Sequence, residues 1–163
     1  MLEKEMLSSG VVISPEALLD HWQGHRRLTR KMVEVFPEEK LFTYSIGGMR
    51  PFSDLVMEMI GMAVPGLQGV ITGNWGHFKT GAEPKTKEAI LKLWDETTQQ
   101  IDELWGQIQP HRFEEKDIAF GKWEGPIYFF IFYWIDNEIH HRGQGYVYLR
   151  SIGIEPPAFW DRE

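Results

Sequence analysis

Glu58, Asn137 and His141 are the side chains in this sequence best suited to bind a cation or to form a buried hydrogen-bonded network. Apart from Asp54, Glu58 is the only charged residue in the apolar stretch 51–76. An unpaired carboxylate buried there would cost several kcal/mol, so we expect a metal ion, a histidine or an arginine opposite it. The alternative is that Glu58 lies on the outer face of its helix and is hydrated.

Asn137 and His141 lie in the most apolar stretch of the chain, residues 126–153, which begins with a proline and ends at a glycine. This pattern predicts one helix of about seven turns. Along it a seam recurs at alternating steps of four and three: Phe130, Trp134, Asn137, His141, Gln144 and Tyr148. Such a seam faces other helices, which places Asn137 and His141 on the buried side. Gln144 is placed to orient a ligand or a bound water.

Other polar residues of this stretch have simpler interpretations. Glu138 and Arg142 are four apart on a neighbouring stripe and are predicted to form a local ion pair, worth about a few tenths of a kcal/mol if exposed. His140 points about 100° around the helix from His141. We expect His140 to pack against another helix or to support a subunit contact.

The first predicted helix carries a second pair of histidines, His21 and His25, four residues apart. This spacing suits a metal-binding pair, but no third ligand is evident nearby. An ordinary role at a helix interface is therefore the main alternative. The basic run 25–31 is interpreted as the solvated flank of the same helix.

The composition indicates a soluble chain of ordinary domain size. Its 163 residues are expected to form a single domain, 1–163, with a formal charge of −7 and no cysteine. The acidic balance argues against nucleic acid as a partner. The longest apolar run, 127–135, is too short to span a membrane, and the N-terminus is too polar for a signal peptide. We therefore expect a cytoplasmic protein with no membrane partner.

Apolar periodicity and breaker residues predict an all-α fold, a four-helix bundle. The expected helices span residues 14–36, 51–64, 86–110 and 126–153. Pro65 and Gly66 are expected to interrupt the second helix. The glycine-rich stretch 69–84 is expected to form a long connection between the second and third helices, and the alternative is that its first residues extend the second helix. Residues 37–50 are expected to be a loop, and 111–125 a small hairpin or an irregular loop.

Four helices, with NEIHHRGQGYVYLRSIGIEPP at the end of the last one, resemble the DinB family, a four-helix bundle of the DinB/YfiT-like type. The resemblance covers nearly the whole chain. It rests on HWQGHRRLT in the first helix, FSDLVMEMI in the second, and EIHHRGQ with a downstream LRSIG and Pro-Pro. It implies one divalent metal ion, bound by a histidine of the second helix and two histidines spaced by four in the last.

In this sequence the three family positions fall on Glu58, Asn137 and His141, so only the last histidine is present. Carboxylate, amide and imidazole donors with added water favour manganese, magnesium or iron, although manganese, iron, nickel and zinc are not distinguished by sequence. The alternative is a metal-free triad in which Asn137 and His141 neutralise Glu58.

Two functions are consistent with these residues. In the first, a bound metal activates water or a thiol, as the resemblance implies for a metal-dependent hydrolase or thiol transferase. In the second, a non-catalytic stress-response or small-ligand-binding bundle has lost its metal. It would bind a small apolar molecule among four aromatic residues, Trp22, Phe130, Tyr133 and Trp134. The resemblance also implies a homodimer and, from a relative, damage-inducible expression.

Overall fold

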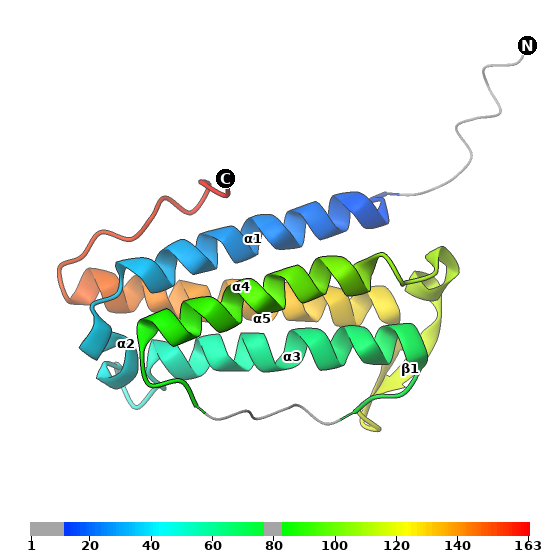
Figure 1. Ribbon diagram of the computed structural model, residues 1–163, viewed down its shortest axis with the longest axis horizontal. Coiled ribbons are helices and arrows are strands. Elements are labelled where there is room, and N and C mark those ends of the chain that lie inside the picture. The colour runs from blue at the N-terminus through cyan, green and yellow to red at the C-terminus, as the bar shows by residue number, and fades with distance from the viewer. Residues whose placement is uncertain (1–11, 77–82) are drawn as a thin grey trace, which may run out of the picture.

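The computed structural model describes residues 12–76 and 83–163 and shows an all-α protein built on a bundle (Figure 1). Four long helices lie side by side: α1 (Pro15–Val35), α3 (Phe52–Thr72), α4 (Lys87–Trp105) and α5 (Ile127–Ser151). The short helix α2 (Glu38–Thr43) lies at one end of the bundle. A hairpin of β1 (Lys116–Ala119) and β2 (Trp123–Pro126) lies at the other end. The predicted four-helix bundle is confirmed.

Local sequence signals set the starts of the helices. The Ser14 hydroxyl accepts a hydrogen bond from the backbone N–H of Ala17, and Thr86 caps α4 in the same way through Ala89. These bonds satisfy backbone donors that a helix start leaves free. α5 begins directly after Pro126, because a proline there loses no intrahelical hydrogen bond. The predicted starts of these helices are therefore close to the observed ones.

The predicted interruption of the second helix at Pro65 is wrong. α3 continues through Pro65 to Thr72 and ends at Gly73, whose φ of 69° lies in the left-handed region that glycine favours. Leu67 and Val70 are fully buried beyond the proline, so their packing outweighs the loss of one backbone hydrogen bond. Gly66 is needed for a different reason: a Cβ there would lie 2.3 Å from the ring of Trp134 on α5.

The connections also differ from the expected loops. Part of the expected loop 37–50 forms α2, where Leu41 is fully buried. Residues 111–125 hold the end of the 3-10 turn η1 (Pro110–Glu114) and then the hairpin, one of the two predicted alternatives. Of the predicted connection 69–84, residues 69–72 belong to α3 and residues 77–82 lie outside the described residues.

The core contains two groups of apolar side chains, one toward each end of the bundle. Toward the hairpin, Trp22 packs against Trp105 and Trp134, with ring centroids 6.2 and 6.1 Å apart. Toward α2, Phe36 stacks on Phe52 with their centroids 4.7 Å apart. Such aromatic pairs add to the stability that burial itself provides. The polar residues described below lie between and beside these groups.

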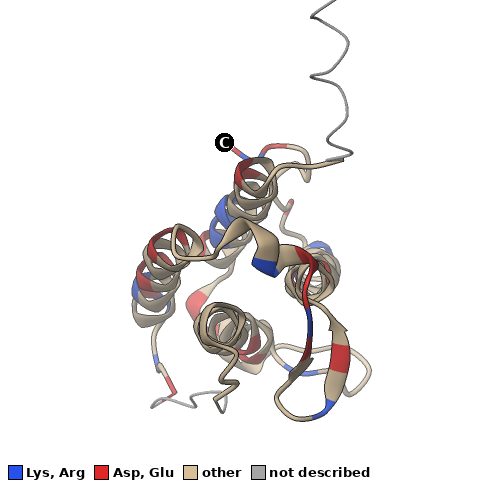
Figure 2. Ribbon diagram, turned by 90° about the vertical axis from the view of Figure 1, so that its right-hand side faces the viewer, with Lys and Arg blue, Asp and Glu red and all other residues tan. Residues whose placement is uncertain are grey.

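α3 is the one described helix that is long and apolar enough to cross a membrane. Half of its apolar window is buried against the rest of the bundle, which is also typical of core helices in soluble proteins. Figure 2 looks along the helices and shows acidic and basic residues mixed over the helices and the hairpin. The absence of a membrane or nucleic-acid partner stays a prediction.

Candidate functional site

The structure brings Glu58, Asn137 and His141 together between α3 and α5, and we call these residues the cavity cluster. His141 Nε2 lies 3.0 Å from Glu58 Oε1. The Asn137 amide nitrogen donates to the same oxygen at 3.2 Å and lies 3.2 Å from His141 Nε2. The three positions meet because residues 137 and 141 are one turn apart on α5 and face the middle of α3.

Arg50, which precedes α3, completes the surroundings of Glu58. Its Nη2 lies 2.6 Å from the second carboxylate oxygen, Oε2. Burial acts to raise the pKa of Glu58, but hydrogen bonds from His141, Arg50 and Asn137 together lower it below its ordinary value. The lowered pKa keeps the carboxylate ionised at pH 7, and the side chain is 31 % exposed, so it is reachable from solvent. Sequence reasoning missed Arg50, although a lone arginine two turns before Glu58 was a usable signal.

The polar atoms around His141 indicate which of its ring nitrogens carries a hydrogen. Glu58 Oε1 can only accept, so the ring Nε2 carries a hydrogen. Nδ1 lies 3.3 Å from Gln144 Oε1, and the Gln144 amide nitrogen lies 3.2 Å from His140 Nε2. The Gln144 amide therefore contacts both neighbouring histidines.

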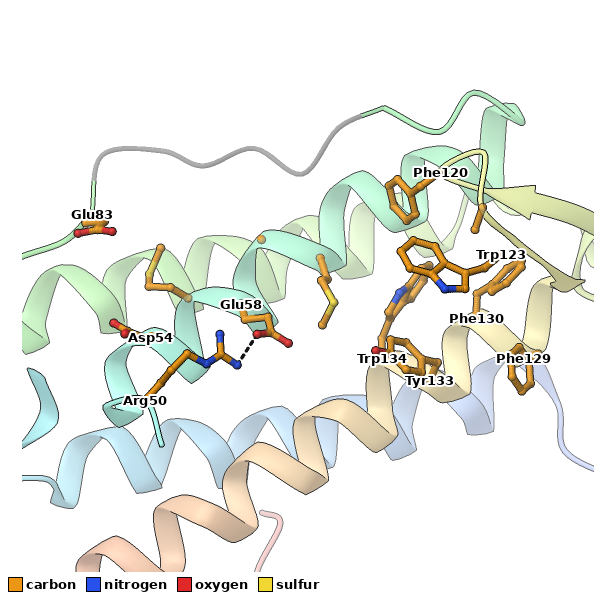
Figure 3. Close-up of a pocket in the computed structure, with 14 residues that line it drawn as sticks. Arg50, Asp54, Glu58, Glu83, Phe120, Trp123, Phe129, Phe130, Tyr133 and Trp134 are labelled. Atoms are coloured by element: carbon orange, nitrogen blue, oxygen red, sulfur yellow. Dashed lines mark ion pairs between the residues drawn. The ribbon is translucent and has the colours of Figure 1, made fainter. Parts of the chain in front are cut away.

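One member of the cavity cluster, Glu58, lies at the wall of a cavity of about 620 Å³ (Figure 3). Glu58 lines it, together with Arg50, Asp54 and Glu83. Aromatic side chains of the hairpin and α5 form the other wall: Phe120, Trp123, Phe129, Phe130, Tyr133 and Trp134. Three of the four predicted aromatic residues therefore line the cavity. Trp22 does not: it is 1 % exposed and packs behind Trp134. The hairpin aromatics were missed because the hairpin's placement was not predictable.

Comparison with known proteins agrees with this architecture. The sequence model of the DinB family matches residues 6–162. This chain belongs to the DinB family. A DinB-like protein from Bacillus cereus ATCC 10987 superposes with a TM-score of 0.72 at 21 % identity, covering 88 % of this chain and 95 % of that one. A DinB-like protein from Bacillus subtilis gives 0.72 at 17 % identity, covering 87 % and 96 %. No curated protein matches the sequence.

The DinB resemblance implies a divalent metal ion, and the donor atoms of the cavity cluster are spaced suitably for one. Glu58 Oε1, His141 Nε2 and Asn137 Nδ2 form a triangle with sides of 3.0, 3.2 and 3.2 Å. Ligand atoms on one face of a divalent ion are roughly 3 Å apart at ordinary bond lengths. Asn137 Oδ1 is buried and has no hydrogen-bond partner among the described residues. A half-turn of the amide would present this oxygen as a ligand.

Two features of the cavity cluster nevertheless oppose metal binding. His141 must present Nε2 without a hydrogen, which would then be carried by Nδ1 facing Gln144 Oε1, and the hydrogen bond to Glu58 would be lost. Arg50 already neutralises the carboxylate, which lowers the attraction for a second cation. The site can therefore hold a divalent ion through Glu58, Asn137 and His141, but at a disadvantage relative to three histidines.

A second group of polar side chains lies on the neighbouring stripe of α5, against α1 and α4, and we call it the inner cluster: His25, Arg26, Thr29, Glu138 and Arg142. The predicted ion pair of Glu138 and Arg142 is present but buried, since the two side chains are 2 and 6 % exposed and their nearest charged atoms lie 3.9 Å apart. The Thr29 hydroxyl donates to Glu138 Oε1 at 2.6 Å. Burial raises the pKa of Glu138, and Arg26 is the strongest of the groups that oppose this.

His25 belongs to the inner cluster and takes the interfacial role that the sequence favoured over a metal pair with His21. Its Nδ1 accepts a hydrogen bond from Arg142 Nη2 at 2.8 Å, and its ring meets that of His21 edge to face. Burial and then the charge of Arg142 lower the pKa of His25 to about 3, so it is neutral at pH 7. The interface alternative accounts for this geometry.

The interpretation of residues 25–31 as a solvated flank is wrong for Arg26, which is 1 % exposed. Arg26 Nε donates to the Thr98 hydroxyl at 2.9 Å, and its guanidinium lies 3.9 Å from the Trp94 ring centroid. Burial lowers the pKa of Arg26 to about 10, so it still carries its charge at pH 7. A basic residue on a helix with one polar stripe gave no sign that it would point inward.

Proposed function

We propose that this DinB-family chain binds a small, largely apolar organic molecule in the cavity between α3, the hairpin and α5. One observation carries the proposal: Glu58 is both a wall residue of the cavity and the centre of the cavity cluster. A ligand in the cavity would therefore meet an ionised, partly exposed carboxylate beside an aromatic wall. Pockets of this size with a few convergent polar groups are the usual form of small-molecule sites.

A metal-dependent reaction is the second candidate, and the triangle of donor atoms in the cavity cluster favours it. A divalent ion held by Glu58, Asn137 and His141 would act as a Lewis acid toward water or a thiol. A hydrolase or a thiol transferase would both use such a site. We rank this candidate second because the hydrogen bond from His141 to Glu58 and the Arg50 ion pair oppose metal binding.

The binding proposal can be tested with N-phenyl-1-naphthylamine, a neutral probe whose fluorescence rises in apolar surroundings. Trp123 lines the cavity and is 49 % exposed, so Trp123→Ala should weaken probe binding by about threefold or more with little cost to folding. Trp160 is 72 % exposed and does not line the cavity, so Trp160→Ala is the matched control. Equal effects of the two variants, or no probe binding by the parent, would contradict the proposal.

The homodimer stays a prediction, as do the cytoplasmic location and the role in a stress response. α5 exposes several large apolar side chains that a subunit contact would cover: Tyr128, Phe129, Tyr133, Ile139 and Val147, each between 38 and 56 % exposed. Light scattering at micromolar concentration should give twice the chain mass of 19.1 kDa. A mass of one chain would remove the prediction.

A further inference from the structure

The cavity is chemically divided along its length. Figure 3 shows Arg50, Asp54 and Glu83 toward one end, the aromatic side chains at the other, and Glu58 between them. Met57 and Met62 also line the cavity. A molecule that fills the cavity would meet carboxylates at one end and rings at the other. The shape of the suitable ligand is therefore an elongated one with two different ends.

We infer that the cavity takes an elongated molecule with an apolar body and a positively charged end group, such as a primary ammonium. This inference rests on the proposed binding function and adds the ligand class. The apolar body would lie against Phe130, Tyr133 and Trp134, and the charged end near Asp54. The methionines between them have flexible side chains that adapt to ligands of different width.

The charges of the cavity wall favour a cation. Among the described residues, three carboxylates, those of Asp54, Glu58 and Glu83, line it with one guanidinium, that of Arg50. Glu58 is matched by Arg50 at 2.6 Å and by His141 at 3.0 Å, so its charge is already compensated. Asp54 and Glu83 supply the remaining negative charge.

Neither of these two carboxylates has a strong cationic partner among the contacts of the described residues. Asp54 accepts a hydrogen bond only from the Ser53 hydroxyl, at the long distance of 3.4 Å. Glu83 meets Lys85 at 3.7 Å, and both side chains are more than 80 % exposed. Exposed pairs of this kind are weak and exchange easily with other cations. A ligand ammonium would thus add a partner to Asp54 without breaking an existing strong one.

An anionic end group would fit less well. Arg50 is the one cationic side chain among the described residues that line the cavity, and its guanidinium is bound to Glu58. An anion would have to compete with Glu58 for Arg50 and would lie close to Asp54. A neutral end group would avoid this repulsion but would gain nothing from Asp54. The expected order of affinity is cation first, then neutral molecule, then anion.

Three ligands with the same apolar body test this order: 4-phenylbutylamine, 4-phenylbutanol and 4-phenylbutyrate. Each is titrated at pH 7 and low salt against the protein loaded with N-phenyl-1-naphthylamine, and displacement of the probe is followed by fluorescence. The amine should bind about threefold to fivefold more tightly than the alcohol, and the acid more weakly than both. Added salt should reduce the advantage of the amine.

Two variants localise the effect. Asp54→Asn should bring the affinity for the amine close to that for the alcohol, because it removes the uncompensated carboxylate while leaving the aromatic wall intact. Glu155→Gln changes the net charge equally at an exposed position that does not line the cavity, and it should leave the ratio unchanged.

The outcomes separate the two proposals. If neither the probe nor any of the three ligands binds, small-molecule binding itself fails. If the alcohol or the acid binds as tightly as the amine, or if Asp54→Asn leaves the preference for the amine intact, binding stands and the cationic ligand class is wrong. If Glu155→Gln reduces the preference as much as Asp54→Asn, the effect comes from the overall charge and the inference also fails.

Discussion

α5 carries two polar clusters on adjacent stripes, and they differ in what surrounds them. The cavity cluster borders a space of about 620 Å³ through Glu58, which is 31 % exposed, and Asn137 Oδ1 has no hydrogen-bond partner among the residues that the structure describes. The inner cluster is enclosed by α1, α4 and α5, and Glu138 and Arg142 are 2 and 6 % exposed. The inner cluster contains a carboxylate, two arginines and a histidine, and the cavity cluster contains a carboxylate and a histidine, with Arg50 bound to the carboxylate. Their ionisable residue types are therefore similar, and the main difference lies in their surroundings.

This difference in surroundings indicates that the cavity cluster is a candidate binding site and that the inner cluster has a structural role. In the inner cluster the buried charges are matched by neighbours: Thr29 donates to Glu138, and Arg142 donates to His25. Such a network restricts how the helices can pack. Removing one partner leaves a buried charge uncompensated in an apolar interior. The cavity cluster retains an unused acceptor and access to a cavity, so a ligand or an ion can enter it without unfolding the bundle.

The largest expected effect breaks the inner cluster. Glu138→Gln removes the carboxylate that contributes most to compensating Arg26 and Arg142, so the free energy of unfolding should fall by about 3 kcal/mol or more. Glu58→Gln makes the same chemical change in the cavity cluster and should cost at most about 1 kcal/mol, because Glu58 and Arg50 are partly exposed. Urea denaturation at pH 7 measures both. Equal losses in the two variants would show that the clusters do not differ as described.

His25 gives the second effect, which depends on pH. Its pKa is about 3 in the folded protein and near 6.5 in the unfolded chain. The stability that neutral His25 contributes is therefore complete above pH 6.5 and is lost as the pH falls toward 3. We expect the parent to lose about 1 to 3 kcal/mol over this range beyond the loss in His25→Asn, which cannot titrate but still offers Arg142 an acceptor. If urea denaturation showed the same loss of stability with falling pH in the parent and in His25→Asn, the lowered pKa of His25 would be contradicted.

Glu58 should give the smallest effect. Its pKa is lowered below the ordinary value of 4.5, so its contribution to stability is present above that pH and is lost as the pH falls through the folded value. The loss should begin below about pH 4.5 and stay below about 1 kcal/mol, because the carboxylate is partly exposed. Thermal unfolding of the parent and Glu58→Gln between pH 5 and 3 would reveal it. An acid loss as steep as that from His25 would place Glu58 in a more buried site.

Much of the bundle could be predicted because its signals are local. Ser14 and Thr86 cap helices through their own neighbours, and the seam through Asn137 and His141 needs only helical periodicity. The continuation of α3 past Pro65 could not be predicted in this way, because it depends on burial of Leu67 and Val70 against other helices. The close approach of Trp134 to Gly66 is likewise a contact between distant segments.

The candidate site was predictable in its residues and not in its surroundings. An acidic residue in an apolar helix and a histidine on a seam both point inward by elementary energetics. Arg50 and the hairpin residue Trp123 complete the site, but their positions depend on how loops fold back on the bundle. The inner cluster was missed because Arg26 and Glu138 look like surface residues in the sequence, and only the three-helix contact buries them.

We predict that hydrogen bonds and the Arg50 ion pair hold Glu58, Asn137 and His141 together in this chain, in preference to a metal ion. A calorimetric titration with Mn²⁺ and Zn²⁺ at pH 7 tests it, using the parent beside the double variant Glu58→His/Asn137→His, which restores the three histidines implied by the family resemblance. The same double variant with His141→Ala is the control for unspecific binding. We predict binding by the restored variant alone, with heat absent from the parent and the control at micromolar metal. Micromolar or tighter binding by the parent would contradict the claim.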